Sequence, residues 1–459
     1  MKRSKILFFV ATVFVVSMVL SACQPQVVTQ VVTQVVTQVV TQQVAVEVTP
    51  TPINYGDVAW LSTQFNTITE AEAIRGVILK GFPAKVDLVT DDSGPFFDQI
   101  NAEVKAGKGT VSVVSALAGE FSTLQASNSL KDLTSLKAEL QSAGIPDALW
   151  NVAKLGTDKT YYIPMMQATY IMAVNKKALP YLPTGADVNA LTYDQLLQWA
   201  KNIKTATGEA KLGFPAGDNG LLHRFFEGFL IPAYTGGVVT TFKSADAVTA
   251  WQWMKDVWPY VNPQSTTYGF MQEPLLSGEV WIAWDHTARL IDAFTTAPND
   301  FIAVPVPAGP KGRAFMPVIA GLGIPVTAPN EVGAEALIKF METPDAQINI
   351  LRETGFFPIV NTSYPGYVSP GVKTEGDAVT AQANAKDALP ALLPQGLGGQ
   401  GDMFNKPYRD AFTAIVLNGA DITSTLAAQA TNLQAIMDTA KAPCWSPDPD
   451  SAGQTCQVK

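Results

Sequence analysis

The folded part of the sequence opens with VAWL at 58–61, VDLV at 86–89 and VSVV at 111–114. Apolar and β-branched residues dominate these short runs, which is the composition of a strand. The segments between them, 69–80 and 96–105, carry apolar residues at helical spacing. Strands that alternate with helices predict parallel pairing, because each helix returns the chain to the same edge of the sheet. The sequence therefore predicts an α/β fold.

Polar residues directly follow the ends of the predicted strands. They are Thr63, Gln64, Asp91, Asp92 and Glu120. Ligands of open α/β sheets bind beyond the carboxyl ends of the strands. We therefore expect these side chains to form one wall of a ligand site.

The composition is that of a large folded chain with an acidic surface. The chain has 459 residues, of which 47% are hydrophobic and 15% are charged. This suffices for a sizeable core and for two or three domains of ordinary size. The formal net charge is −9, and a negative surface repels phosphate backbones and anionic headgroups. We therefore expect no nucleic-acid partner.

Residues 1–22 have the features of a secretory signal. Three cations within 2–5 precede an apolar run at 6–20, which is short for a membrane span of about 20 residues. The run closes in Leu20-Ser21-Ala22-Cys23, which resembles the lipobox of bacterial lipoproteins. In those proteins the cysteine receives a diacylglyceryl group, so we expect Cys23 to anchor the chain at the outer face of the cell membrane. A plain signal peptide or a transmembrane anchor is the alternative.

A low-complexity segment follows the expected lipid site. Residues 27–42 are four copies of Val-Val-Thr-Gln, and Thr49-Pro50-Thr51-Pro52 comes soon after. We interpret 23–53 as a lipid-anchored tether that holds the folded part off the membrane. Because valine and threonine favour strands, a β-strand is the alternative.

Further motifs follow Ser62-Thr63-Gln64 in a particular order. They are LKDL (130–133), YIP (162–164), NK (175–176), AWD (283–285) and GLGIPV (321–326). In this order and spacing the chain resembles the extracellular solute-binding proteins of family 1, the maltodextrin-type sugar receptors of ABC importers. The resemblance covers about 55–440.

The resemblance implies a periplasmic-binding-protein-like fold (type II) with two lobes, each a mixed sheet flanked by helices, joined by a hinge. The N-terminal lobe would comprise 54–165 and 317–357, and the C-terminal lobe 166–316 and 358–459. The runs at 171–174 and 318–320 are short and apolar, as crossing strands should be, and the second is bounded by Pro317 and Gly321. Helices are expected at 192–205, 244–257, 331–341, 344–353 and 422–440.

Ligand-binding residues are carried over from the family by position. Sugars present polar edges and apolar faces, so their sites combine aromatic rings with carboxylates and amides. The positions that match are Gln64, Asp92, Glu120, Gln167, Trp284, Asp285, Tyr408 and Arg409. For the aromatic residues the alternative is core packing, and for the polar ones a solvated loop.

Cys444 and Cys456 remain once Cys23 is assigned to the lipid. In an oxidising compartment, two cysteines twelve residues apart predict a local disulfide. A metal pair is the alternative, although no histidine lies near them in the sequence.

Other patterns are weaker indications of function. The run at 396–401 fits G-x-G-x-x-G, but no predicted strand precedes it, so we interpret it as a loop rather than a dinucleotide site. His223 and His286 form no recognisable catalytic or metal motif. A glycosidase needs only two carboxylates, and sequence alone leaves that possibility open. We expect no cofactor, no bound metal and no catalysis.

We therefore expect an extracytoplasmic receptor that captures a small solute, a sugar above all, by hinge closure and delivers it to an ABC permease as a monomer. A polyamine, iron or a phosphate-like anion is the alternative solute, and Arg224, Arg289 or Arg409 could bind an anion. A sensory or adhesion lipoprotein is the alternative outside transport.

Overall fold

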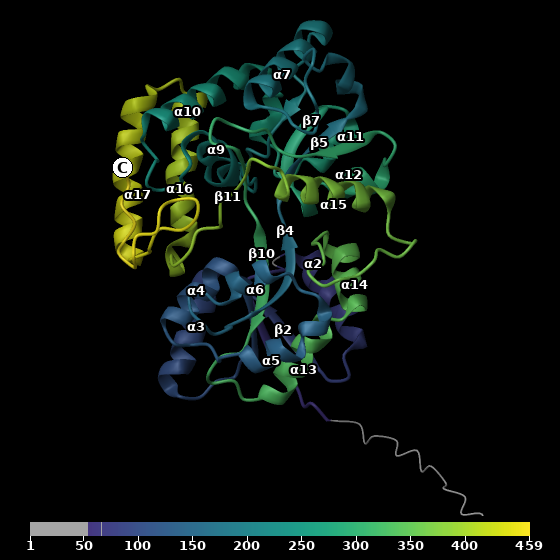
Figure 1. The fold of residues 1–459 in the computed structure, drawn as a ribbon, viewed down its shortest axis with the longest axis vertical. Helices are drawn as coiled ribbons and strands as arrows, with labels where there is room; N and C mark the ends of the chain where they lie inside the picture. The colour runs from purple at the N-terminus through teal and green to yellow at the C-terminus, as the bar shows by residue number, and fades with distance from the viewer. Residues whose placement is uncertain (1–53, 66) are drawn as a thin grey trace, which may run out of the picture. The chain divides into compact units, whose positions relative to one another are not determined.

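The computed structural model describes residues 54–65 and 67–459, so the predicted signal, Cys23 and the tether lie outside the described residues. Two sheets form the centres of two lobes, one above the other in Figure 1. The predicted α/β fold is confirmed. No helix within the described ranges is both long and apolar enough to cross a membrane.

The first lobe is built on a five-stranded sheet of order β2-β1-β3-β10-β4. Its strands are β1 (Val58–Ser62), β2 (Val86–Thr90), β3 (Val113–Leu117), β4 (Ile163–Ala168) and β10 (Val318–Gly323). The strands β1, β2 and β3 are parallel, as the alternation of strands and helices predicted, whereas β10 runs antiparallel to β3 and β4. The helices of this lobe are α2 (Ile68–Ala73), α3 (Ser93–Ala106), α4 (Ala118–Ala126), α5 (Thr134–Glu139), α6 (Asp147–Ala153), α13 (Glu331–Met341) and α14 (Pro344–Thr354).

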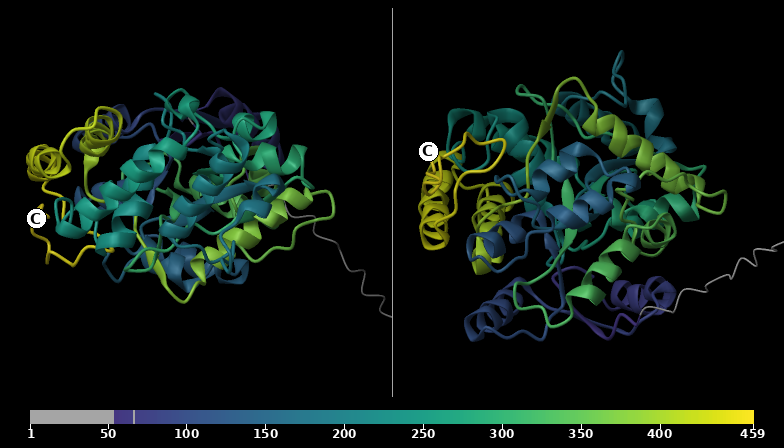
Figure 2. Two further views of the ribbon diagram at one scale, coloured as in Figure 1. Left: turned by 90° about the horizontal axis from the view of Figure 1, so that it is seen from above. Right: turned by 60° about the horizontal axis from the view of Figure 1, so that its bottom comes forward.

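The second lobe contains a four-stranded sheet of order β6-β7-β5-β8 and a two-stranded sheet of β11 and β9. The strands are β5 (Tyr170–Asn175), β6 (Leu212–Gly213), β7 (Ile282–His286), β8 (Phe301–Val304), β9 (Arg313–Phe315) and β11 (Ala388–Pro390). The helices are α7 (Tyr193–Thr207), α8 (Leu222–Phe225), α9 (Ile231–Thr235), α10 (Ala245–Val257), α11 (Gln272–Ser277), α12 (Ile291–Thr296), α15 (Pro370–Ala383), α16 (Gly401–Phe412) and α17 (Ile422–Ala440). The views of Figure 2 agree with Figure 1 that α16 and α17 lie side by side at one edge.

Local signals explain where several helices begin and end. The Thr192 hydroxyl accepts from the Gln195 backbone N–H, and the Gln195 side chain accepts from the Thr192 backbone N–H, so α7 begins at a capping box. Ser244 caps α10 in the same way through the Ala247 N–H. The helix α14 ends at Gly355, whose φ is 72°. Glycine adopts this left-handed conformation readily because it has no Cβ.

Several predicted elements differ from the structure in their bounds, such as the helix predicted at 96–105, which begins at Ser93. The third strand begins at Val113 rather than at residue 111 and continues to Leu117. Every residue from 111 to 116 is buried, and a fully buried strand has no alternation to mark its ends. The helix predicted at 69–80 is α-helical only to Ala73, and continues as a π-helical turn and a 3-10 turn that ends at Gly81.

The chain passes between the lobes through segments that are hydrogen-bonded together. It leaves β4 and enters β5 across Thr169, whose hydroxyl donates to the Met316 carbonyl at 2.9 Å. Gln167 and Phe357 exchange both backbone hydrogen bonds, at 2.7 and 3.1 Å. Each lobe has its own hydrophobic cluster on either side of these segments.

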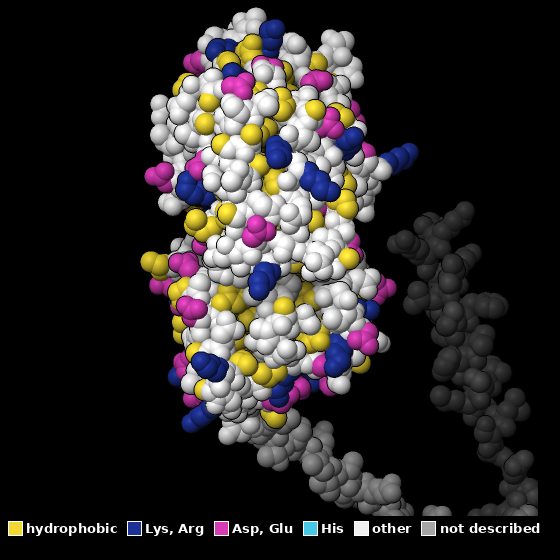
Figure 3. All heavy atoms as spheres, turned by 90° about the vertical axis from the view of Figure 1, so that its left-hand side faces the viewer, with side chains coloured by type: hydrophobic (Ala, Val, Ile, Leu, Met, Phe, Trp, Pro, Cys, Tyr) yellow, Lys and Arg dark blue, Asp and Glu magenta, His cyan; other side chains and the backbone are white. Residues whose placement is uncertain are grey.

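Charged side chains of both signs are interspersed on the face drawn in Figure 3, which includes the edge with α16 and α17. No large field of a single sign covers this face. The structure pairs Cys444 with Cys456 in a disulfide that follows α17.

Candidate functional site

A pocket of about 310 Å³ lies between the lobes, and we call it the interlobe pocket. Its wall combines residues of the first lobe with residues of the second. They are Thr63, Gln64, Phe65, Thr67, Glu70, Leu117, Tyr170, Leu221, Arg224, Phe270, His286, Ala288, Arg289, Val318, Phe356 and Leu393. This volume lies at the small end of the range for small-molecule sites, which starts at about 300 Å³.

Tyr170 is one of the aromatic residues that line the interlobe pocket, and it is 3% exposed. Its ring stacks on that of Trp284, with centroids 4.7 Å apart and planes inclined by 5°. His286 packs edge-on against the same tyrosine at 5.0 Å. Because these contacts hold the tyrosine ring from behind and from the side, its orientation is set before any ligand arrives.

Two arginines of the second lobe reach the interlobe pocket. Arg224 pairs with Glu227 at 2.9 Å, and the Glu227 side chain is only 1% exposed. Burial raises the pKa of Glu227 to about 7, against the opposing effect of Arg224. Arg289 stacks over the Phe270 ring at 4.4 Å from its centroid, a cation–π contact.

The two histidines at this site are uncharged at neutral pH. Burial lowers the pKa of His286 to about 3, with Arg289 adding to the effect. Burial also lowers the pKa of His223 well below its usual range, and nearby arginines lower it further. The His223 Nδ1 atom lies 3.3 and 3.1 Å from Nε and Nη2 of Arg409, so Nδ1 serves as an acceptor. The positive charge of the site therefore comes from its arginines.

A smaller cavity of about 90 Å³ adjoins the interlobe pocket, with which it shares Leu117, Arg224 and Leu393, and we call it the side pocket. Glu120 lines it and organises its first-lobe wall: Oε2 accepts from the Thr63 hydroxyl at 2.7 Å and Oε1 from the Ser93 hydroxyl at 2.5 Å. The same carboxylate accepts from the Leu117 N–H at 2.8 Å, which caps α4. The side pocket therefore presents a fixed carboxylate beside hydroxyl groups.

The glycine-rich run at 396–401 forms the other wall of the side pocket. Gly398, Gly401 and Asp402 line it. The backbone N–H groups of Gly396 and Gly398 donate to the hydroxyls of Ser122 and Thr123, at 3.0 and 3.2 Å. This run is a loop that leads into α16, as predicted, and it contacts α4 of the first lobe.

The structure brings only some of the sequence-predicted site residues to these two cavities. Gln64 lines the interlobe pocket and Glu120 the side pocket. Asp92 is exposed at the start of α3, and Arg409 is exposed on α16. Gln167 donates from Nε2 to the Pro358 carbonyl at 3.1 Å, a contact between chain crossings. These last three residues line neither cavity.

The other three predicted residues are fully buried. Trp284 and Tyr408 have no exposed surface, so in this structure neither reaches a ligand directly. Trp284 is the platform behind Tyr170, and Tyr408 packs against Phe242 at 5.2 Å. Asp285 accepts from the backbone N–H groups of its neighbour His286 and of Met271, at 2.7 and 3.0 Å. Burial raises the pKa of Asp285 to about 7.

Several lining residues were missed by the sequence argument. Tyr170, Phe270, His286 and Phe356 all face the interlobe pocket. Tyr170 is the first residue of β5, directly after the chain passes between the lobes, which is a position that could have indicated it. Phe270 follows a glycine in a loop before α11, and no periodicity indicates its role.

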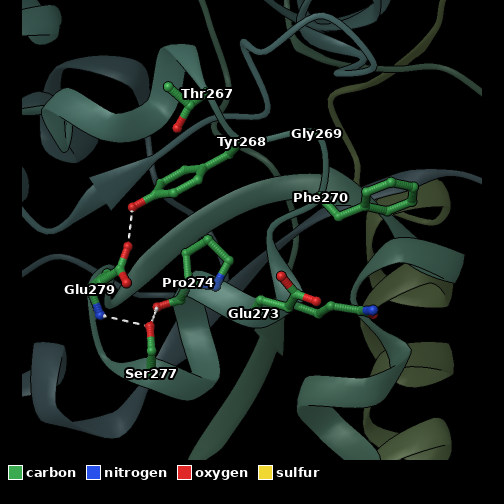
Figure 4. Close-up of a pocket in the computed structure, with 9 residues that line it drawn as sticks. Thr267, Tyr268, Gly269, Phe270, Glu273, Pro274, Ser277 and Glu279 are labelled. Carbon is green, nitrogen blue, oxygen red and sulfur yellow. Dashed lines mark hydrogen bonds between the residues drawn. The ribbon is translucent and has the colours of Figure 1, made fainter.

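Two larger depressions, of about 480 and 540 Å³, lie within the second lobe alone. Figure 4 shows the first, where the Tyr268 hydroxyl donates to the Glu279 carboxylate and Phe270 points away from this pair toward the other side. Phe270 also lines the interlobe pocket and so separates the two. Only the interlobe pocket and the side pocket combine residues of both lobes among these four. Within the described ranges, no group of three or more histidine, cysteine, aspartate or glutamate residues could hold a metal ion.

Residues 66–348 match the family model described as bacterial extracellular solute-binding protein. This match covers more than half of the chain, so the chain belongs to the bacterial extracellular solute-binding proteins. Among curated protein sequences, none matches significantly.

Solved structures share the fold at low sequence identity. Maltose-bound MalE3 of T. maritima has a TM-score of 0.64 and 18% identity, with 83% of this chain and 100% of that chain covered. The GacH receptor of Streptomyces glaucescens, solved unliganded and in complex with acarbose, has a TM-score of 0.60 and 18% identity, with 83% of this chain and 98% of that chain covered. UgpB of Mycobacterium tuberculosis in complex with glycerophosphocholine has a TM-score of 0.62 and 20% identity, covering 84% and 99%. The predicted two-lobe periplasmic-binding-protein-like fold is confirmed.

Proposed function

We propose that the chain is a receptor that captures a carbohydrate between its lobes and delivers it to the permease of an ABC importer. The observation that carries this proposal is the interlobe pocket, whose wall takes residues from both lobes, among them the partly exposed ring of Phe270 and the amide of Gln64. An aromatic face packs against the C–H face of a sugar ring, and amides bind its hydroxyls. Membership of the solute-binding family supports the receptor role.

The proposed mechanism is hinge closure between a lobe of 54–165 with 317–357 and a lobe of 166–316 with 358–459. The hydrogen-bonded crossings at Thr169 and Gln167 support this division, because few segments join the two hydrophobic clusters. A solute that contacts both lobes binds the closed form more tightly, and the equilibrium shifts by that difference in affinity. The closed receptor then docks on the permease. This mechanism needs no catalytic residue and no cofactor.

The receptor is proposed to be anchored outside the cell by a lipid on Cys23. The test is incorporation of labelled palmitate into the chain during growth. Label that persists in Cys23→Ser would contradict the anchor and leave the solute-binding proposal unaffected.

The solute-binding test is a thermal-shift screen of the full chain against sugars, polyamines, amino acids and anions. A solute at a thousandfold above its Kd stabilises the folded state by about 4 kcal/mol. Gln64→Ala removes a lining amide that is partly exposed, and losing one neutral hydrogen bond should weaken binding by about 2- to 10-fold. The matched control is Gln198→Ala, on the exposed face of α7.

A sugar that binds with this pattern supports the receptor. A shift with polyamines alone would contradict the carbohydrate and retain the receptor. No shift with any solute would favour the alternative of a sensory or adhesion lipoprotein.

A further inference from the structure

Resting on the proposed function, we propose that the solute is a carbohydrate that bears an anionic group, as a hexuronate or a sugar phosphate does, and that Arg289 and Arg224 bind this group. The inference concerns the same interlobe pocket and specifies which class of carbohydrate it accepts. It follows from the free donors of the two arginines and from the uneven charge of the connected cavities.

Arg289 is held in place through Nη1, whereas its Nε and Nη2 donors remain available to a ligand. Its Nη1 atom donates to the carbonyls of Asn219 and Gly269, at 3.0 and 3.1 Å, and its plane stacks on Phe270. Among the described residues, Nε and Nη2 donate to no acceptor. A guanidinium fixed in this way offers a fork of donors that fits a carboxylate or a phosphate.

Arg224 stands where the two cavities meet and retains most of its donors. It lines both the interlobe pocket and the side pocket. Only Nη1 is engaged, by the Glu227 carboxylate at 2.9 Å, and Glu227 lines neither cavity. The remaining N–H groups of Arg224 find no acceptor within the described residues. Because burial raises the pKa of Glu227 to about 7, its charge offsets that of Arg224 only in part at neutral pH.

The acidic groups nearby do not cancel the charge of the arginines within the interlobe pocket. Asp285 lies outside its wall and accepts two backbone N–H groups instead. Glu70 is the one carboxylate among the described lining residues, and it is partly exposed in the first turn of α2. His286 lines the pocket in its neutral form. The interlobe pocket therefore carries an excess of positive charge.

The side pocket has the opposite character. Glu120 and Asp402 line it together with the Ser93 hydroxyl. A simple anion would use only the arginines, whereas a neutral sugar would contact the Gln64 amide and the carboxylate and hydroxyl groups and leave the free arginine donors unpaired. A solute that carries hydroxyls at one end and an anionic group at the other uses both, which is why an acidic carbohydrate fits better than either.

The experiment is calorimetric titration of the full chain with matched solutes. The probes are galacturonate and galactose, their oligomers of equal length, glucose 6-phosphate and glucose, and inorganic phosphate and sulfate. The variants are Arg289→Gln and Arg289→Lys, with Arg352→Gln as the control because Arg352 pairs with Glu353 on the exposed side of α14.

We expect one acidic sugar to bind the wild type at least about 10-fold more tightly than its neutral counterpart. Arg289→Gln should weaken the acidic sugar by about 10- to 100-fold and the neutral one by less than about 3-fold. Arg289→Lys should retain part of the preference, because it keeps the charge without the fork. Arg352→Gln should change neither. Galacturonate and glucose 6-phosphate distinguish a carboxylate from a phosphate as the anionic group.

Each other outcome overturns a definite claim. Equal affinity for a neutral sugar and its acidic counterpart overturns the inference and leaves the carbohydrate receptor intact. Equal loss of both sugars in Arg289→Gln also overturns it, because the arginine would then act only by holding the loop at Gly269. Binding of inorganic phosphate or sulfate without any sugar overturns the carbohydrate function itself, and binding of no probe overturns both.

Discussion

Gly119 of the first lobe lies directly against Pro394 of the second lobe beside the side pocket, so Gly119→Ala tests that contact. A Cβ at this position would lie 2.1 Å from the Pro394 carbonyl oxygen and 3.1 Å from its carbon. Ordinary contact would require the Pro394 backbone to move by more than about 1 Å, and such overpacking costs about 1–3 kcal/mol. The movement also strains the hydrogen bonds from Gly396 and Gly398 to α4, each contributing about 1 kcal/mol.

The magnitude follows from these opposing effects. Replacing a helical glycine by alanine stabilises a helix by about 0.5–1 kcal/mol, so the net loss for Gly119→Ala should be about 1–3 kcal/mol. The matched control is Gly94→Ala, because Gly94 lies at the second position of α3 with nothing within 4 Å of the added Cβ. The assay is urea unfolding, which gives the free energy of unfolding of each variant. If Gly119→Ala proved as stable as Gly94→Ala, the close approach between α4 and the loop at 393–398 would be refuted.

Three further predictions concern buried and bridging groups. Glu375 is fully buried, and neither of its carboxyl oxygens has a partner among the described residues. Burial raises its pKa well above 4.5. Its neutral form stabilises the fold fully below pH 4.5, and this contribution is lost as the pH rises toward the pKa of Glu375 in the folded state. In urea unfolding, the free energy of unfolding of Glu375→Gln relative to that of the wild type should therefore rise by about 1.4 kcal/mol per pH unit in that interval. The same rise in Glu72→Gln, at an exposed position, would contradict the assignment of this pH dependence to Glu375. Asp448 accepts the backbone N–H groups of 238–240 at 2.8–3.0 Å, so Asp448→Asn should lower the free energy of unfolding by about 2 kcal/mol, and a loss under about 0.5 kcal/mol would refute this anchoring. The disulfide between Cys444 and Cys456 closes a loop with a sequence separation of 12. Cys444→Ser should therefore lower the free energy of unfolding by about 2–3 kcal/mol in the same assay. A reductant that destabilises this variant as much as the wild type would show that the loss does not come from the disulfide.

Much of the fold could be predicted because its signals are local. The helices predicted at 331–341 and 422–440 have the bounds of α13 and α17, and the residues at which two further helices were predicted to begin, Thr192 and Ser244, are the N-caps of α7 and α10. A periodicity of 3.6 residues, a capping hydroxyl and a terminal glycine act within a few residues, so they can be recognised without the rest of the chain. The bounds of β3 could not be predicted, because burial on both faces removes the alternation of apolar and polar residues that marks a strand.

The candidate site was predicted only where it depends on chain order. Gln64 and Glu120 follow strands of one parallel sheet, and parallel strands bring their carboxyl ends to one edge. The aromatic wall was assigned to Trp284, whereas the structure places Tyr170 there and the tryptophan behind it. On the antiparallel pair β5 and β7, Tyr170 is opposite His286 at the strand end, and Trp284 is two pairs further into the lobe, opposite Met172.

The sequence by itself determined the α/β class, the bounds of several helices, and Gln64 and Glu120 as site residues at the sheet edge. Only the tertiary structure decided that Tyr170 rather than Trp284 faces the pocket, and that Arg224 and Arg289 meet there from separate elements. Residues 224 and 289 lie 65 positions apart in the chain, and the donors that each keeps free depend on partners such as Glu227 and Gly269. Strand register and side-chain pairing are long-range contacts, so no local pattern of residue types can specify them.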